Sequence, residues 1–591
     1  MYLIEINLNK KNKITKNKFL FQKKELSIIF KAKKNISTKY NDNFFCLIDG
    51  FVNDNFDEKL NIEVIFDKLS KLKKKKELEN FLNSLSGAFN LFFYSFTKKD
   101  FLLFRDKDGF KPLFYKHNIK KKEFYFSPSP NLILNSLKEK KINKVFFMKY
   151  IMCRYNILYG KKDTFFKNLY FLEAGKYLFY KSKKLYLSRY NYFKIKTNNK
   201  IGYKESKKQS YKLIKENFYN QREKFNNKSI LALSGGLDST SAAVFLKEIN
   251  KPVHSFTAKY ETDLQINEFK KAKLVAKKFC KSWMPINISS DDFLKFWKTC
   301  YDYHDFPLPT SSCLGYMILY SKISKLGYNL IINAGNPDHY FLGNYPAYLY
   351  NLCDLYHKNK IKFNNELQHW IKNHATKSFP KNKIVFKEFY RKNICQNKKF
   401  TIKPENEIFG KQYLVKKNKI NMFLKSPYSI KSSSYINAYV IFSLWYSERT
   451  PGILSFNEIH KKTKVSTIDP FVSEMIKNYT FSLPSEYKIK NAVGKVILRE
   501  MMKEKLPKKI INNRSKIGFD VPFEYWIKKN KKFRMFILDN LNFAANEKIF
   551  KFLDLKKIDN DIRKNRIINS MFVWQLINSI MWFKKIKYWT E

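Results

Sequence analysis

The chain has 591 residues, of which 44% are hydrophobic, so it is long enough for two or three domains with sizeable cores. Its 114 Lys and Arg residues exceed its 51 Asp and Glu residues by 63, an excess that would ordinarily suggest nucleic acid or an anionic membrane as partner. The basic residues are mostly lysine and occur in short scattered runs, which favours codon-usage drift over a dedicated binding stripe. The charge therefore excludes no enzyme class.

The seven cysteines form no Cys-x-x-Cys pair, and no apolar run reaches the 18 or so residues that a membrane helix needs. The start of the chain lacks the apolar stretch of a signal peptide. These features predict a cytoplasmic protein with free thiols and no membrane partner. The apolar tail at 572–583 is accordingly predicted to be a packing helix.

Residues 1–195 are predicted to form short alternating strands and turns. The runs at 85–89 (Leu-Ser-Gly-Ala-Phe) and 105–115 (Arg-Asp-Lys-Asp-Gly-Phe-Lys-Pro-Leu-Phe-Tyr) are followed by matching stretches at 124–127 and 164–175. Together they resemble the glutaminase domain of glutamine-dependent asparagine synthetases. The resemblance implies an Ntn-hydrolase-like αββα sandwich.

The nucleophile that this resemblance requires is missing. In class II glutaminases a cysteine becomes the first residue after removal of the initiator methionine, whereas position 2 here is Tyr2. A phenol with a pKa of about 10 is mostly protonated at neutral pH. Cys46, the most N-terminal cysteine, lies among Phe, Leu and Ile residues that predict a buried strand. We therefore predict a domain that keeps the glutaminase fold without its chemistry, as in β-lactam synthetases and lasso-peptide cyclases.

A phosphate-binding turn is predicted next, where the apolar run 229–233 is followed by Ser234-Gly235-Gly236-Leu237-Asp238-Ser239. A bare Ser-Gly-Gly is usually an ordinary strand-turn-helix, but the full pattern adds two hydroxyl donors and a carboxylate. The glycines let backbone N–H groups approach an anion. The apolar residues of 240–249 predict a helix that starts at this turn and directs its positive end there. Asp238 is the expected Mg²⁺ ligand. No Gly-Lys-Ser/Thr follows, so kinase-like transfer is disfavoured.

This hexapeptide resembles the signature loop of the ATP-pyrophosphatase superfamily, which includes asparagine, β-lactam, argininosuccinate and GMP synthetases and tRNA-modifying enzymes. Runs at 483–484, 495–499, 506–507 and 514–522 are similar, in the same order, to the Leu-Pro, Lys-x-x-Leu-Arg, Leu-Pro and Arg-x-Lys-x-Gly-Phe-x-x-Pro series of asparagine synthetases. The resemblance implies that Lys516 faces the acyl-adenylate. It also implies that ATP or pyrophosphate is bound by Leu233, Ser234, Gly235, Gly236, Asp238, Ser239, Thr257 and Gly335.

Two segments depart from that family's pattern. In the turn at 334–345, Asp338 is the expected second magnesium carboxylate, but Asn336 stands where the family has a glutamate. An amide cannot act as a base at neutral pH. At 465–471, Ser466 and Ile468 replace the charged pair of the family's Glu-x-Arg-x-Pro-Phe run. Substrate and amine chemistry are therefore predicted to differ from asparagine formation.

These features predict an α/β protein in which the sandwich at 1–195 precedes a doubly wound parallel-sheet ATP-pyrophosphatase domain at 205–591, with a helical, substrate-shaping insertion at 346–450. The predicted function is an ATP-dependent ligase that adenylates a small-molecule or peptide carboxylate, with Lys516, Asp238 and Asp338 as catalytic residues and the two aspartates as Mg²⁺ ligands. An amine or ammonia would then attack the acyl group. A tRNA-modifying pyrophosphatase and a non-catalytic family member are the alternatives. The sequence disfavours a nucleic-acid partner and leaves open whether the chain forms a homodimer.

Overall fold

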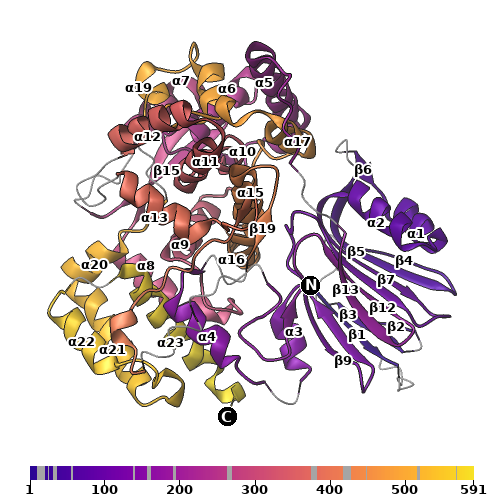
Figure 1. The fold of residues 1–591 in the computed structure, drawn as a ribbon. Coiled ribbons are helices and arrows are strands. Elements are labelled where there is room, and N and C mark those ends of the chain that lie inside the picture. Colours follow the sequence, from indigo (N-terminus) through magenta and orange to yellow (C-terminus); the bar gives the residue numbers. More distant parts are fainter. Residues whose placement is uncertain are drawn as a thin grey trace.

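The computed structural model describes residues 1–8, 20–23, 25–30, 36–54, 58–137, 140–155, 161–190, 195–262, 269–374, 382–416, 423, 428–447, 449–514, 519–566 and 569–590. The N-terminal strands form a sandwich that lies beside a larger part built from the rest of the chain (Figure 1).

The sandwich consists of two antiparallel sheets with helices on both outer faces. One sheet has the order β11 (Tyr170–Phe171), β9 (Phe114–Asn118), β10 (Glu123–Ser127), β1 (Tyr2–Asn7), β3 (Leu26–Phe30), β2 (Leu20–Lys23). The other has the order β13 (Lys184–Arg189), β12 (Lys176–Lys181), β8 (Phe101–Arg105), β7 (Ser86–Ser95), β5 (Phe44–Asn53), β4 (Ile36–Tyr40), with β6 (Lys59–Leu60) on β5. Helices α1 (Ile62–Lys71) and α2 (Lys75–Ser84) cover the second sheet, and α3 (Pro130–Asn135) covers the first. The αββα prediction is confirmed.

The side chains of β5 alternate between two hydrophobic layers, one between the two sheets and one between a sheet and its helices. Phe45 and Leu47 face the other sheet, whereas Cys46 and Ile48 face the helices, because successive side chains of a strand point to opposite faces. Cys46 is fully buried in this strand, as predicted.

The larger part is built on a parallel sheet with the order β16 (Ser282–Ile288), β15 (His254–Tyr260), β14 (Ser229–Ala232), β17 (Leu330–Ile332), β20 (Ser466–Ile468). Ile230 and Leu231 of β14 enter different hydrophobic cores, so both faces are covered. One face packs against α5 (Tyr203–Asn220), α6 (Leu237–Glu248) and α7 (Phe269–Phe279), and the other against α8 (Ser290–Thr299) and α9 (Ser311–Lys325). The doubly wound prediction is confirmed.

The strand order reverses at β14, because β15 and β16 lie on one side of it and β17 and β20 on the other. In open parallel sheets the crevice beyond the carboxyl ends of the strands at such a switch point is where ligands bind. The carboxyl end of β14 carries the predicted phosphate-binding turn.

Helices dominate the remainder of the larger part. Residues 346–450 contribute α11 (Tyr345–Lys358), α12 (Lys360–His374), α13 (Lys383–Asn393), α15 (Tyr435–Phe442) and the ribbon β18 (Thr401–Ile402) with β19 (Ile430–Lys431). Shorter elements near the sheet are α10 (Pro337–Tyr340), α17 (Glu474–Ser482), α18 (Val496–Met502), α19 (Lys508–Ile511) and the ribbon β21 (Ile489–Lys490) with β22 (Val493–Gly494). The others are α16 (Arg449–Thr463), α20 (Phe523–Lys529), α21 (Lys531–Ala545), α22 (Leu555–Arg563) and α23 (Ser570–Thr590).

The C-terminal helix α23 is a packing helix, as predicted. Phe572, Trp574 and Leu576 are buried in the same core as α8 and α9, and α4 (Lys144–Met152) of the N-terminal region packs against α23. Within the described ranges, the helices are too short or too polar to cross a lipid bilayer.

A buried group of charges joins the sandwich to the larger part, and we call Lys107, Asp108, Glu474 and Lys477 the interface cluster. The Lys477 ammonium lies 2.7 Å from an Asp108 oxygen and 2.8 Å from a Glu474 oxygen, and Lys107 lies 3.1 Å from Glu474. The indole N–H of Trp445 donates to Asp108 at 3.2 Å. Burial opposes a charged lysine, but the carboxylates raise the pKa of Lys477 above its ordinary value.

Candidate functional site

The turn after β14 has the geometry of an anion-binding site. Gly235 has φ of 77°, in the left-handed region that favours glycine, and a Cβ there would lie 2.8 Å from the Ala272 backbone nitrogen. Helix α6 begins at Leu237, within this turn as predicted, and its N-cap residue is Gly236. Because glycine has no side chain to cap the helix, the first amides of α6 keep their capacity to bind an anion.

Two hydroxyl groups converge on the same turn. The Oγ atoms of Ser234 and Ser239 lie 3.1 Å apart, and the Ser234 amide donates to Ser239 Oγ at 3.1 Å. The Gly236 amide donates to Ser234 Oγ at 3.2 Å. The hexapeptide therefore folds on itself and presents hydroxyls beside a helix N-terminus, as the sequence predicted.

The two predicted magnesium carboxylates meet beside this turn, and a lysine lies between them. Asp238 stands in the first turn of α6, and Asp338 stands in α10, just after β17. Lys495 forms an ion pair with Asp238 and lies 2.7 Å from Asp338 Oδ1. Burial alone would lower the pKa of Lys495, but the two carboxylates raise it above its ordinary value. We call these three residues the carboxylate–lysine site.

A strained ribbon delivers Lys495 to this position. Asn491, Ala492 and Lys495 have φ of 52°, 53° and 59°, in the left-handed region that costs energy for residues other than glycine. Glu366 of α12 accepts from the Asn491 and Ala492 amides at 2.9 and 2.6 Å, and the Tyr348 hydroxyl of α11 accepts from the Gly494 amide at 3.1 Å. The helices of 346–450 thus hold the ribbon that ends in Lys495.

Gly343 leaves room for the site. A Cβ at this position would overlap the Cε of Lys495 and a carboxylate oxygen of Asp338. Its amide donates to the Asp338 carbonyl at 2.8 Å, which keeps the turn after α10 close to the carboxylates. Glycine is therefore required here by close approach of side chains.

The donor set fits a divalent cation bound with a polyphosphate. The Lys495 ammonium contacts both carboxylates, which shows that their spacing allows one cation to reach both. Carboxylate oxygens are preferred ligands of Mg²⁺, which in such sites also takes phosphate oxygens. The side chains of Asp238 and Asp338 are 16% and 12% exposed, so an ion entering from solvent can reach them.

Three other predicted ATP contacts have their polar groups engaged within the protein. The Leu233 amide donates to the Phe256 carbonyl at 2.9 Å, and the Thr257 hydroxyl donates to the Leu233 carbonyl at 2.5 Å. The Gly335 amide donates to Asp469 Oδ2 at 3.0 Å. Contact of these residues with nucleotide stays a prediction. The predicted catalytic Lys516 falls outside the described residues.

Sequence reasoning missed Lys495, Tyr348, Glu366 and Asp469. Lys495 was visible in the Lys-x-x-Leu-Arg run, which carried the family resemblance without a role for its lysine. Asp469 lies in the 465–471 run, which was noted only for the charged pair that it lacks. Tyr348 and Glu366 are single polar residues in helices and left no local signal.

The glutaminase-like sandwich offers no reactive thiol. Cys46 is fully buried, and burial raises its pKa far above the ordinary range. Cys153, at the end of α4, is buried with a pKa of about 12 for the same reason. Tyr2 is 1% exposed in the inner core, where burial raises the pKa of its phenol. All three groups are therefore protonated at neutral pH.

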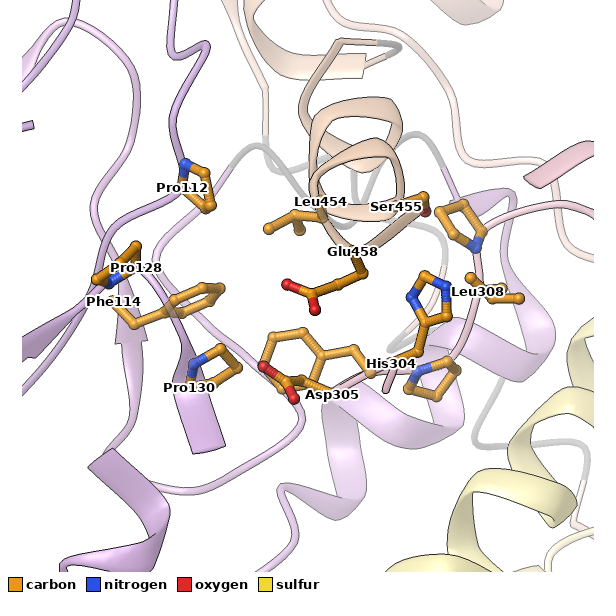
Figure 2. Close-up of a pocket in the computed structure, with 13 residues that line it drawn as sticks. Pro112, Phe114, Pro128, Pro130, His304, Asp305, Leu308, Leu454, Ser455 and Glu458 are labelled. Carbon is orange, nitrogen blue, oxygen red and sulfur yellow. The ribbon is translucent and has the colours of Figure 1, made fainter. Parts of the chain in front are cut away.

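A small cavity lies where the sandwich meets the larger part, lined by five prolines, Phe114 and the facing acids Asp305 and Glu458 (Figure 2). Its volume of about 30 Å³ holds about two water molecules, which is too little for a substrate. Desolvation, with Glu458 nearby, raises the pKa of Asp305 to about 7. This mostly apolar cavity is therefore too small to be the reaction site.

Comparisons with known proteins follow the division seen in the fold. A family model described as asparagine synthase matches residues 228–584, and one described as a glutamine amidotransferase domain matches residues 53–191. Asparagine synthetase [glutamine-hydrolyzing] 1 of Bacillus subtilis (strain 168) is 26% identical over 161 residues, which are 26% of this chain and 24% of that protein. The chain thus matches about a quarter of the length of that relative.

Two solved structures show weaker similarity. Glutamine phosphoribosylpyrophosphate amidotransferase from B. subtilis, complexed with ADP and GMP, has a TM-score of 0.18 and 12% identity, covering 39% of this chain and 50% of that one. A structure described as the allosteric regulatory enzyme of purine biosynthesis has a TM-score of 0.20 and 9% identity, covering 45% and 67%.

Proposed function

Because the chain belongs to the asparagine synthase family, we propose that it is an ATP-dependent ligase that forms an amide bond through an acyl-adenylate. The observation that carries the proposal is the carboxylate–lysine site, which lies beside an anion-binding turn at the switch point of the parallel sheet.

In the first step an oxygen of the substrate carboxylate attacks the α-phosphorus of ATP. The bond between the α-phosphorus and the bridging oxygen breaks, and pyrophosphate leaves with the electron pair. Asp238 and Asp338 would hold Mg²⁺, which neutralises charge on the phosphate oxygens. The α6 amides and the hydroxyls of Ser234 and Ser239 are placed to bind the departing pyrophosphate.

The ammonium of Lys495 is proposed to act on the negative charge of the same phosphate oxygens. In the structure it contacts both aspartates, and it would give up that place when Mg²⁺ binds them. Its positive charge, still beside the site, would stabilise the negative charge that builds on the phosphates as pyrophosphate leaves. In the second step an amine attacks the acyl carbon, AMP leaves, and the amine loses a proton. Lys516 remains the proposed partner of the acyl-adenylate, by resemblance alone.

The sandwich is proposed to lack glutaminase activity, so the amine would come from the substrate or from free ammonia. Three observations support this: the buried protonated thiol of Cys46, the raised pKa of Cys153 and the tyrosine at position 2. The helices of 346–450, which hold the Lys495 ribbon, are proposed to shape the substrate pocket.

ATP–pyrophosphate exchange on the purified full-length protein tests the proposal, across a panel of small-molecule and peptide carboxylates. We expect substrate-dependent exchange that falls at least 100-fold in Asp238→Ala, because the variant loses a metal ligand. Asp108→Ala, which removes a carboxylate from the interface cluster, is the matched control. Exchange without a carboxylate requirement, or AMP release only with tRNA, would refute the proposal, and glutamine hydrolysis would refute the inactive-glutaminase part.

A further inference from the structure

Asp469 stands at the carboxyl end of β20, where it reaches across to the turn that follows β17. Its Oδ2 accepts from the Gly335 amide at 3.0 Å, the Asn336 amide at 2.9 Å and the Asn336 side-chain amide at 2.8 Å. Its Oδ1 accepts from the Phe471 amide at 3.0 Å. One carboxylate therefore satisfies four donors from two segments more than 130 positions apart in the sequence.

The turn held in this way carries one of the two proposed metal ligands. Asn336 is the N-cap residue of α10, and Asp338 is the second residue of that helix. The Asn333 amide donates to the Ile468 carbonyl at 2.9 Å, so the strand before the turn is also registered against β20. The position of Asp338 relative to Asp238 therefore depends on where β20 places Asp469.

The four donors around Asp469 require an acceptor at both side-chain oxygens, which a carboxylate provides and a neutral amide of the same size does not. An ionised carboxylate accepts at both oxygens, and such charge-assisted bonds are stronger than neutral ones. Burial raises the pKa of Asp469, while the donors from Asn336, Phe471 and Gly335 favour the charged form. An asparagine would present N–H groups to at least one of these donors.

We propose that Asp469 is a positioning residue: by fixing Asn336, it sets Asp338 at the separation from Asp238 at which one cation contacts both carboxylates. The inference rests on the proposed function in taking that cation to be the Mg²⁺ of Mg-ATP. It goes further because it assigns the metal geometry to the residue that follows β20, which is not itself a metal ligand.

Asp354 provides a matched control within the same chain. Its side chain is buried, and its oxygens accept from the Tyr435 and Ile436 amides at 2.8 and 3.0 Å at the start of α15. Burial likewise raises its pKa. These bonds fix α15 and do not reach the turn after β17, so Asp354→Asn removes a hydrogen-bonded carboxylate of the same kind without acting on that turn.

The experiment measures ATP binding to the full-length protein by calorimetry over a series of Mg²⁺ concentrations, for wild type, Asp469→Asn and Asp354→Asn. Both variants are expected to unfold at lower temperature than wild type. Only Asp469→Asn is expected to raise the Mg²⁺ concentration for half-maximal ATP binding, by about tenfold. Asn336→Ala removes one of the four hydrogen bonds and is expected to raise the same Mg²⁺ concentration by about threefold. This variant replaces Asp469→Asn in the test if Asp469→Asn does not fold.

The outcomes separate the two proposals. Wild-type protein whose ATP binding ignores Mg²⁺ would overturn the proposed function and this inference with it. Mg²⁺-dependent binding in wild type that is unchanged in Asp469→Asn and Asn336→Ala would overturn the inference alone. An equal shift in Asp354→Asn would also overturn it, because the effect would then be general loss of stability.

Discussion

The interface cluster and the carboxylate–lysine site use the same groups for different ends. In each, one lysine ammonium lies between two carboxylates, Asp108 and Glu474 in the first and Asp238 and Asp338 in the second. The interface cluster is the more enclosed, with Lys477, Asp108 and Glu474 each between 6% and 8% exposed. It also includes a second lysine, Lys107, and the indole of Trp445.

The surroundings decide what each group can do. The interface cluster joins two parts of the chain and has further donors facing its carboxylates, so it is expected to hold the parts together. The carboxylate–lysine site stands beside a helix N-terminus and two hydroxyls, with more exposed carboxylates and a glycine that leaves space. The same arrangement, a lysine between two acids, therefore holds two parts of the chain together in the interface cluster. In the carboxylate–lysine site it marks a candidate cation site.

Replacing Lys477 by methionine should have the largest effect on stability. Removing one partner of a buried ion pair leaves buried charge behind and typically costs about 3 kcal/mol or more. We expect Lys477→Met to lower the free energy of unfolding by about 3 kcal/mol, as measured by denaturant titration. Millimolar Mg²⁺ should not restore it. If Mg²⁺ restored the free energy of unfolding of Lys477→Met, the interface cluster would also bind cations. It would then not differ from the carboxylate–lysine site in this respect.

Replacing Lys495 by methionine should have a smaller and reversible effect. The carboxylates of Asp238 and Asp338 are more exposed, so we expect the free energy of unfolding to fall by about 1 kcal/mol. Millimolar Mg²⁺ should restore most of this loss, because the ion takes the place of the ammonium between the carboxylates. Exchange of pyrophosphate into ATP should still fall about tenfold, since the charge of Lys495 is absent from the transition state. A loss that Mg²⁺ leaves unchanged would contradict the assignment of the cation site.

A third effect, which depends on pH, is expected at the contact between the two parts, where Asp305 accepts from Ser129 and Asn131 of the sandwich. The pKa of Asp305 is raised to about 7, so the protonated form favours the folded state. The contribution of protonated Asp305 to the free energy of unfolding is fully present below about pH 4, the pKa of an unfolded aspartate. It is lost as the pH rises through 7, where the folded protein releases the proton. Asp305→Asn, which does not titrate, should therefore gain about 2.6 kcal/mol over wild type between pH 5 and pH 8. Thermal unfolding at both pH values measures this, and a constant difference would contradict it.

The elements that the sequence predicted well are those whose signals are local. The apolar run at 229–233, the two glycines and the apolar neighbours of Cys46 are all local features of the chain, and the structure confirms the strand, the turn and the buried thiol. Helix α6 likewise starts within the hexapeptide, at the turn where it was predicted to start.

The site residues divide in the same way. Asp238 was recognisable because the glycines and serines around it are adjacent in sequence, and Asp338 because it follows a predicted turn. Lys495 is 257 positions from Asp238, and Asp469 reaches a turn more than 130 positions away. No periodicity or spacing encodes such pairs.

The sequence by itself determined the family, the two-part α/β organisation and the phosphate-binding turn, because these arise from local patterns of apolar residues, glycines and hydroxyls. Only the tertiary structure decided which lysine lies between the aspartates, which carboxylate holds the turn of Asp338, and which of two similar charge clusters can accept a cation. Those outcomes depend on distances between segments and on access to solvent, and both are fixed when the strands and helices pack.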